Sequence, residues 1–313
     1  MAIENITIIG NSSLTHPIIT ALLSTPSPTP YKISILTHPS HPLSLPPHIP
    51  PNTITHKTSD FTPSSLHAAF LAQDLLISIT SGTDTALQTR IITAALAAGV
   101  PRFIPHEFTH DTQNPRIQSR LPASAARAKV LAHLAAQDGQ IEYVGVATGY
   151  ALDAALASGE MGFDLAWHSA TMHGAGTEVF PASSLAYVGR VVAAVVRRWD
   201  VVRNSYIYAA GVLTCAEEVL GAVERVTGRE WTVGRYGVEE CVREGGERIK
   251  RGFLDSGVEL LERSLLYDGG VGGVEPFRTR GAREILGLEG ETVQGVVEAA
   301  YHAFKHRAEG CGC

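Results

Sequence analysis

The sequence has little positive charge, few cysteines and no long apolar run, and each shortage narrows the class of protein. Its 313 residues carry 25 Lys and Arg against 31 Asp and Glu, a formal net charge of −6 without any basic tract, which argues against a nucleic-acid partner. Four cysteines are too few for a disulfide framework. No segment has the length of a membrane span, and the first residues follow a strand pattern rather than a signal-peptide pattern. We therefore expect a soluble cytoplasmic protein whose partner is neither a membrane nor nucleic acid.

Apolar runs alternate with helix-like segments through the first half of the chain. Hydrophobic residues make up 44% of the sequence, enough for a substantial core. Strands are expected at residues 3–9, 32–36, 52–56, 74–80, 102–104 and 141–146. Helices are expected at residues 85–98, 123–137, 184–198, 216–227 and 293–304. This alternation predicts an α/β protein with a Rossmann-like doubly wound parallel sheet in residues 1–150. The length of the chain allows either one large α/β domain or a smaller C-terminal substrate lobe in residues 151–313, intertwined with the first, and we expect the second.

The turn after the first expected strand is built like a dinucleotide-binding corner that has lost its glycines. In the working corner, Gly-x-x-Gly-x-x-Gly lets backbone amides approach a pyrophosphate at a helix N-terminus. Here Gly10 keeps the first position, whereas Ser13 and His16 stand at the second and third. Their side chains fill space that glycine leaves open, which predicts a lost or vestigial cofactor site. Ser12 and Ser13 could still hydrogen-bond a phosphate.

Residues 106–110, His-Glu-Phe-Thr-His, spell a zinc-protease motif in the wrong setting. That motif needs a helix to place both imidazoles on one face, and here it follows a strand and Pro105, so we expect no metal. Ligands of an open α/β sheet bind beyond the carboxyl ends of its strands, where this loop lies. We predict His106 as a general acid or base and Glu107 and Phe108 as pocket residues. The plain alternative is a solvated His106 and a Glu107 that braces the loop.

Two further sequence patterns match catalytic or metal-binding motifs, but each has a simpler explanation. Tyr301 and Lys305 match the Tyr-x-x-x-Lys pair of short-chain dehydrogenases, yet they stand in the last helix, far past the sheet, so we interpret the match as chance. Cys311-Gly312-Cys313 could bind a metal or oxidise, although a frayed terminus is the simpler interpretation.

The order of several landmarks resembles the NmrA-like and isoflavone-reductase-like branch of the atypical short-chain dehydrogenases, in its fungal form. The most specific segment is residues 94–108, which contains Ala-Ala-Gly-Val-Pro-Arg-Phe-Ile-Pro-His-Glu-Phe. The strand-Gly10 turn, residues 33–38, 59–61 and 73–78, and Gly162-Phe163-Asp164 fit the same order. The resemblance implies a Rossmann domain, a substrate lobe, NADPH and reduction of small natural products, as in secondary metabolism; some members are regulators instead.

Mapping the family's functional positions onto this chain gives a pattern of altered contacts. His38 stands where the family places an Arg for the 2′-phosphate, and neutral imidazole is a poor substitute. Counting back seven residues from Leu134 puts Arg127, not Lys129, at the catalytic Lys position. Arg127 can hold an oxyanion, whereas Lys129 would restore the family's chemistry if the register were shifted by two. The candidate cofactor-binding residues are Gly10, Ser12, Ser13, Leu14, His38 and Ser81.

The segment after the sixth expected strand completes the candidate pocket. By the family's pattern, Thr148, Gly149 and Tyr150 build part of the substrate wall, and Tyr150 could stack on an aromatic ligand or move a proton. A packed core tyrosine explains Tyr150 equally well.

Three functions remain open at this point. The favoured one is a tailoring enzyme for a small aromatic or polyketide-like metabolite that works without redox chemistry, as an isomerase, cyclase or dehydratase, with Arg127 stabilising negative charge. The alternatives are an NADPH-dependent reductase that tolerates a degenerate fingerprint, and a non-catalytic regulator. We expect a monomer or homodimer.

Overall fold

A computed structural model describes residues 2–26, 29–41, 43, 49 and 53–310, and its centre is one parallel sheet. Seven strands lie in the order β11-β6-β5-β4-β1-β2-β3. Their bounds are β1 Asn5–Ile9, β2 Lys32–Thr37, β3 Ile54–Thr58, β4 Leu75–Ser78, β5 Arg102–Ile104, β6 Glu142–Ala147 and β11 Ser205–Tyr208. The order reverses direction at β1, between β4 and β2, and such a switch point is where open α/β sheets bind ligands.

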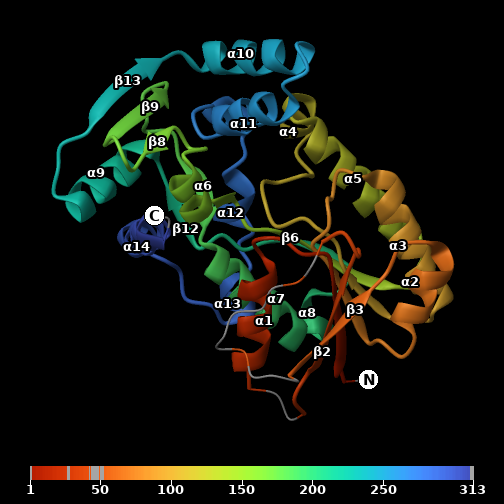
Figure 1. Ribbon diagram of the computed structural model, residues 1–313. Coiled ribbons are helices and arrows are strands. Elements are labelled where there is room, and N and C mark those ends of the chain that lie inside the picture. Colours follow the sequence, from red (N-terminus) through yellow and green to blue (C-terminus); the bar gives the residue numbers. More distant parts are fainter. Residues whose placement is uncertain (1, 27–28, 42, 44–48, 50–52, 311–313) are drawn as a thin grey trace.

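Helices cover both faces of this sheet, as the doubly wound prediction requires (Figure 1). One face carries α1 (Thr15–Ser24) and α7 (Leu185–Arg197), which pack on each other and on Ile6 and Ile8 of β1. The other carries α2 (Pro63–Phe70), α3 (Thr85–Ala97) and α5 (Pro122–Ala135). Successive strand residues alternate between these two cores, so both faces must be apolar.

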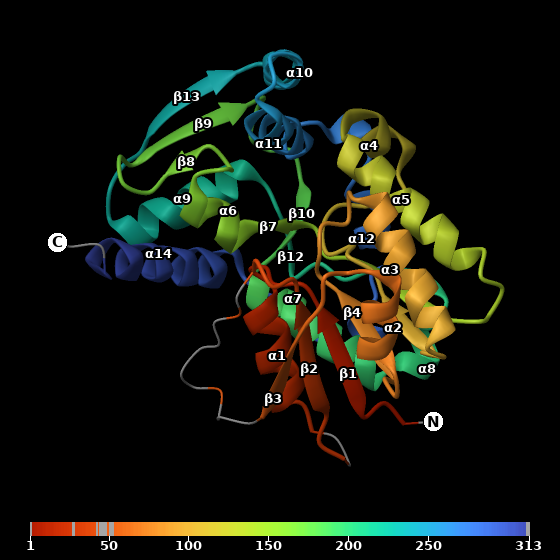
Figure 2. The same cartoon turned by 45° about the vertical axis from the view of Figure 1, so that its right-hand side comes forward.

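A second lobe sits over the edge where the strands end (Figure 2). It contains two three-stranded sheets: β7 Tyr150–Ala151, β10 Phe180–Ser183 and β12 Val212–Thr214, and β8 Phe163–Asp164, β9 Ser169–His173 and β13 Thr232–Tyr236. Its main helices are α6 Leu152–Ser158, α9 Ala216–Thr227, α10 Val238–Lys250, α11 Leu254–Leu265 and α14 Val293–Gly310. Shorter helices are α4 Pro115–Arg120, α8 Trp199–Val202, α12 Glu275–Thr279 and α13 Arg283–Leu286, with a 3-10 turn, η1, at Gly269–Val271.

The expected elements are present, and their ends differ from the predicted ends by a few residues in most cases. The chain crosses between the two parts more than once, because α7, α8 and β11 all come after residue 150 and still belong to the central sheet and its covering layer. Most of the Pro-rich stretch at residues 39–51, expected to be a rigid connector, lies outside the described residues. Within the described part of the chain, no helix is long and apolar enough to cross a membrane.

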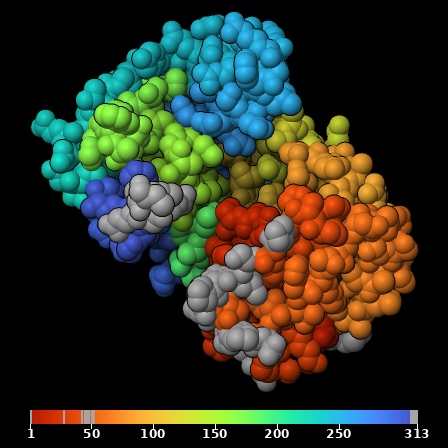
Figure 3. Space-filling model, viewed as in Figure 1, coloured from red at the N-terminus to blue at the C-terminus, as the bar shows by residue number. Residues whose placement is uncertain are grey.

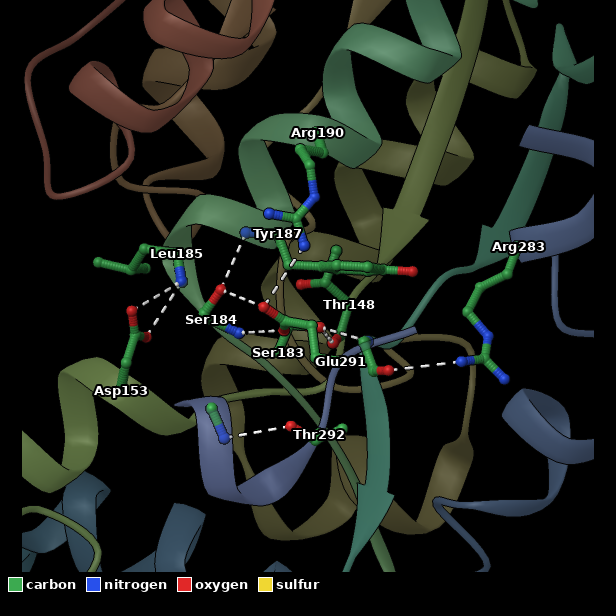
Figure 4. Close-up of polar contacts among 12 residues, drawn as sticks. Thr148, Asp153, Ser183, Ser184, Leu185, Tyr187, Arg190, Arg283, Glu291 and Thr292 are labelled. Carbon is green, nitrogen blue, oxygen red and sulfur yellow. Dashed lines mark hydrogen bonds and ion pairs between the residues drawn. The ribbon is translucent and has the colours of Figure 1, made fainter. Parts of the chain in front are cut away.

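Two carboxylates hold the N-terminus of α7 and tie it to the second lobe (Figure 4). The Ser184 amide and hydroxyl donate to Glu291, at 2.9 and 2.6 Å, and Arg190 lies 3.5 Å from the same carboxylate. The Leu185 amide donates to Asp153 of α6 at 3.0 Å. Carboxylates are favoured at this end of a helix because its amides are unpaired and its dipole is positive. The network therefore fixes how the lobe sits on the sheet.

Candidate functional site

A cleft of about 660 Å³ opens at the carboxyl ends of β1, β2 and β4. Figure 3 shows the molecule hollowed between its red and orange N-terminal part and the green and blue lobe. The lining combines polar strand-end residues with an apolar patch: Gly10, Asn11, Ser12, Thr37, His38, Ser40, His41, Phe61, Ile79, Thr80, Ser81, Leu87 and His106. The cleft therefore occupies the sheet's ligand-binding position, and its size suits a small organic ligand or a cofactor.

Gly10 keeps the shape of the dinucleotide-binding corner. Its φ of +105° is a conformation that other residues rarely adopt. A Cβ at this position would lie 2.9 Å from the side-chain methyl of Thr80 on the neighbouring strand end. The first glycine of the fingerprint is thus required by the fold itself, whatever the cleft binds.

Three backbone amides of this turn are bonded within the turn itself. The Ser12 amide donates to the Thr15 hydroxyl at 2.9 Å, and the Leu14 amide donates to the Ser12 hydroxyl at 3.3 Å. The Thr15 amide donates to the Ser12 carbonyl at 3.0 Å, and Pro17 has no N–H. Ser13 is exposed, and the Leu14 side chain is buried in the core. A diphosphate needs these amides, so the turn does not fit one without breaking its internal hydrogen bonds.

Positive charge is also missing from the cleft. None of its described lining residues is Lys or Arg, and Lys32 is the only Lys or Arg in the first 56 residues of the sequence. Lys32 begins β2, at the end of the strand opposite the cleft. His38 is in contact with Ser40, 2.6 Å from Nδ1 to the hydroxyl, and its ring lies 6.0 Å from the Phe61 ring. The residues present therefore do not fit the 2′-phosphate of NADPH.

Arg127 of α5 lies against the turn that follows β4, next to His106 and outside the residues that line the cleft. A Cβ at Gly82 would lie 3.1 Å from Arg127 Nε and 2.9 Å from the His106 carbonyl, so the turn after β4 packs directly on the guanidinium. Arg127 Nε and Nη1 are buried and have no hydrogen-bond partner among the described residues. Lys129 is exposed, as expected for a side chain two positions further along the helix. The structure thus places Arg127, and not Lys129, beside His106.

His106 lines the cleft but does not titrate near neutrality. Burial, and then the positive charge of Arg127, lower the pKa of His106 to about 3. Its Nδ1 is buried without a partner among the described residues. We expected His106 to act as a general acid or base because imidazole titrates near neutrality. That reason is wrong for His106, because its ring stays neutral near pH 7 and can only donate or accept a hydrogen bond.

Glu107, expected only as a pocket residue, is a buried carboxyl group with a pKa near neutrality. It is 1% exposed, and burial raises its pKa to about 7, while Thr112, Arg127 and Tyr206 act in the opposite direction. The Thr112 hydroxyl donates to one carboxylate oxygen, and the Oε1 atom has no partner among the described residues. A carboxyl group with this pKa can give up and recover a proton under physiological conditions.

Tyr150 begins β7 and is buried in the core of the second lobe, as the alternative of a packed core tyrosine predicts. The Tyr150 ring stacks on His110 at 6.2 Å between centroids, and burial raises its pKa far above the ordinary value, so it keeps its proton. Phe108 is packed in the core. Thr148 and Gly149 instead hold β10: the Ser183 hydroxyl donates to the Thr148 carbonyl at 2.7 Å, and a Cβ at Gly149 would lie 2.4 Å from a carbonyl oxygen of that strand.

A carboxylate of the second lobe also lies within the electrostatic reach of Arg127. Glu262 of α11 is half-buried, and burial raises its pKa while the charge of Arg127 lowers it. Leu261 and Leu265 on the same helix pack on Ile117 of α4, and Arg120 pairs with Asp268 at 2.7 Å. Sequence reasoning missed Glu262, because its position depends on how α11 docks on α4 and nothing local signals that.

The His-Glu-Phe-Thr-His segment does not form the helix that the zinc-protease motif needs. It follows β5 as a loop, and its two imidazoles face different neighbours, His106 toward Phe108 and His110 toward Tyr150. Across residues 2–26, 29–41, 43, 49 and 53–310, no group of three or more His, Cys, Asp or Glu side chains could hold a metal ion. Cys311 and Cys313 lie outside the described residues.

Comparison with known proteins gives one family and a consistent set of relatives. The sequence pattern of the NmrA-like family matches residues 52–244. An Aspergillus flavus protein named oxidoreductase aprR is 31% identical over 300 residues, 95% of this chain and 98% of the relative. Oxidoreductase poxI of Penicillium oxalicum is 29% identical over 249 residues, 76% of this chain and 78% of the relative. Leucoanthocyanidin reductase from Vitis vinifera, solved with NADPH, has a TM-score of 0.72 at 14% identity and covers 95% of this chain and 99% of its own.

Proposed function

This chain belongs to the NmrA-like family, and from that premise we propose that it tailors a small organic molecule by proton transfer rather than by hydride transfer. The substrate class is a small aromatic or polyketide-like metabolite with a carbonyl group that can form an enolate. The reaction class is isomerisation, cyclisation or dehydration.

The observation that carries this proposal is the pairing of Glu107 with Arg127. Glu107 has a pKa of about 7 and a carboxylate oxygen without a described partner, and Arg127 has two buried, unpartnered nitrogens. A substrate oxyanion would supply the hydrogen-bond acceptor that those nitrogens lack. Glu107 would take a proton from a carbon next to the carbonyl and return it at another atom. Arg127 would hold the negative charge while the proton is on Glu107.

The neighbouring groups fit supporting roles in the same reaction. His106 stays neutral near pH 7, so it can donate a hydrogen bond to the substrate without adding charge. Tyr150 keeps its proton and, stacked on His110, packs against the loop that carries Glu107. The apolar patch of the cleft at Phe61 and Leu87 would hold the body of the substrate.

The cleft itself supports a reaction without NADPH. The amides of Ser12, Leu14 and Thr15 are bonded within the turn, and the described lining of the cleft has no Lys or Arg for a phosphate. When bound, NADPH supplies a hydride; the residues of this cleft do not provide the contacts that would hold its three phosphates.

The second candidate is an NADPH-dependent reductase. It is favoured by the relatives: aprR, which matches 95% of this chain, and poxI are both named oxidoreductases. Reduction would require the Ser12 turn to open its internal hydrogen bonds on binding.

Product mass distinguishes the two candidates. Purified protein is incubated with the metabolite extract of a strain that lacks this gene, with and without NADPH, and new products are identified by mass spectrometry. Proton-transfer chemistry predicts, without NADPH, a product of unchanged mass or lighter by one water. Glu107→Gln should abolish its formation, and Glu239→Gln, an exposed carboxylate on α10, should not. A product heavier by two hydrogens that forms only with NADPH would contradict the proposal.

A further inference from the structure

Glu107 is held by a chain of hydrogen bonds that begins on β11. The Thr112 hydroxyl donates to Glu107 Oε2, and the Tyr206 hydroxyl lies 3.1 Å from Thr112 Oγ1. A hydroxyl has one proton and an ionised carboxylate can only accept, so Tyr206 is the donor to Thr112. The other acceptor of Tyr206, the His110 carbonyl, is further away at 3.4 Å. The Thr112 amide in turn donates to the Tyr206 oxygen at 3.0 Å, so two hydrogen bonds join these two residues.

The packing of β11 on β6 determines where the Tyr206 ring lies. Tyr206 pairs in register with Gly145 of β6. A Cβ at Gly145 would lie 2.5 Å from Cδ2 of the Tyr206 ring, so glycine in this strand leaves the space that the ring occupies. Tyr208, two residues further along β11, lies on the same side of the strand, and its hydroxyl donates to Asp111 Oδ1 at 3.3 Å. Two tyrosines of one strand therefore hold the loop that carries Thr112.

This chain engages one oxygen of Glu107 and leaves the other available. Oε2 accepts from Thr112, whereas Oε1 is buried and has no hydrogen-bond partner among the described residues. Burial raises the pKa of Tyr206 well above its ordinary value, so its hydroxyl keeps the proton that it donates. The charged groups that face Glu107 are Arg127 of α5 and Asp111 of its own loop, and neither of them binds Oε1.

We propose that Thr112 and Tyr206 are positioning residues, which anchor Oε2 of Glu107 and thereby assign proton transfer to Oε1. The inference rests on the proposed function for the role of Glu107 as the base, whereas the anchoring can be measured without any substrate. Hydrogen bonds donated to a carboxylate favour its ionised form, so the chain holds the pKa of Glu107 below the value that burial alone would give. Breaking the chain should therefore raise this pKa further.

The test is the pKa of Glu107, measured by carbon-13 NMR of protein labelled at the carboxyl carbon of its glutamate side chains. The resonance that is missing from the spectrum of Glu107→Gln belongs to Glu107, and its chemical shift is followed against pH. Thr112→Val keeps the shape of the side chain without its donor and should raise the pKa by about 1–2. Tyr206→Phe removes the first donor of the chain and should raise the pKa by about 0.5.

Two conservative variants serve as controls. Thr112→Ser keeps a hydroxyl at the same position, so the pKa of Glu107 should stay at the value of the unaltered protein. Tyr143→Phe removes a tyrosine hydroxyl from the neighbouring strand β6 and should also leave it unchanged. Circular dichroism of each variant should show the original fold, because each substitution changes a side chain by only one or two atoms.

The product-mass assay separates this inference from the proposed function. In an active protein, the pH at which turnover rises should move up in Thr112→Val by the same amount as the pKa of Glu107. An unchanged pKa in Thr112→Val or in Tyr206→Phe would overturn the positioning role, whatever the product assay shows. Raised pKa values together with the absence of any proton-transfer product would instead contradict the proposed function and leave the anchoring of Glu107 standing.

Discussion

Replacing Glu107 with Gln should change how the stability of the protein depends on pH. Glu107 is 1% exposed, and burial is the largest cause of its raised pKa. Gln has nearly the shape of a protonated Glu but cannot ionise. The substitution therefore removes the cost of ionising this buried group and little else.

The size of the effect follows from the two pKa values. In the unfolded chain Glu107 loses its proton near 4.5, and in the folded protein it does so near 7. Between these values the folded state binds the extra proton, so the free energy of unfolding decreases as the pH rises. At 1.36 kcal/mol per pKa unit, the loss amounts to about 3 kcal/mol and is complete slightly above pH 7.

The assay is urea unfolding of the original protein and of Glu107→Gln at pH 5, 6, 7 and 8, followed by circular dichroism. Glu107→Gln should gain about 3 kcal/mol relative to the original protein across this range. Glu142→Gln is the control. Burial raises the pKa of Glu142, but hydrogen bonds from Trp199 and Arg203 hold it below its ordinary value. Because the pKa of Glu142 is lowered, the stability that Glu142→Gln removes is fully present above pH 5. The difference in the free energy of unfolding between Glu142→Gln and the original protein should therefore stay constant from pH 5 to pH 8. Parallel curves for Glu107→Gln and the original protein would refute the reasoning.

Three further outcomes follow from the geometry. Glu291→Ala removes the carboxylate that accepts hydrogen bonds from Ser184 at the N-terminus of α7. Urea unfolding should show a free energy of unfolding lower by about 2–3 kcal/mol. A loss below about 0.5 kcal/mol would show that this cap adds little. Arg127→Gln should lower turnover by roughly 100-fold in the mass-spectrometric assay, whereas Lys129→Gln should leave turnover unchanged. Equal effects of the two substitutions would contradict the assigned helix register. Gly82→Ala should lower turnover by roughly tenfold with little change in melting temperature, because the new Cβ would press on the Arg127 guanidinium and the His106 carbonyl. Full activity in this variant would show that the contact is adaptable.

The sheet could be predicted from the sequence because its inner strands are short segments of mostly apolar residues. In β1, Ile6 and Ile8 face one helix layer and Ile9 faces the other, so both sides of the strand must be apolar. The orientation of Arg127 could also be predicted from the sequence. Helical periodicity alone puts Arg127 and Lys129 on nearly opposite faces of α5.

The chemistry of the site could not be predicted in the same way. The pKa values of His106 and Glu107 depend on how deeply each side chain is buried, which no local pattern reports. Glu262 reaches the site only through the docking of α11 on α4. The glycine losses at the first turn were visible in the sequence, but the internal hydrogen bonds of Ser12 and Thr15 were not.

The central claim is that the cleft at the ends of β1, β2 and β4 accepts an organic substrate and not NADPH. Calorimetric titration of the purified protein with NADPH tests it most directly. The account predicts no saturable binding up to about 1 mM, because the amides of Ser12, Leu14 and Thr15 are already bonded within the turn and no Lys or Arg lines the described part of the cleft. Saturable binding of one equivalent with a Kd near 1 μM, about −8.2 kcal/mol, would contradict it.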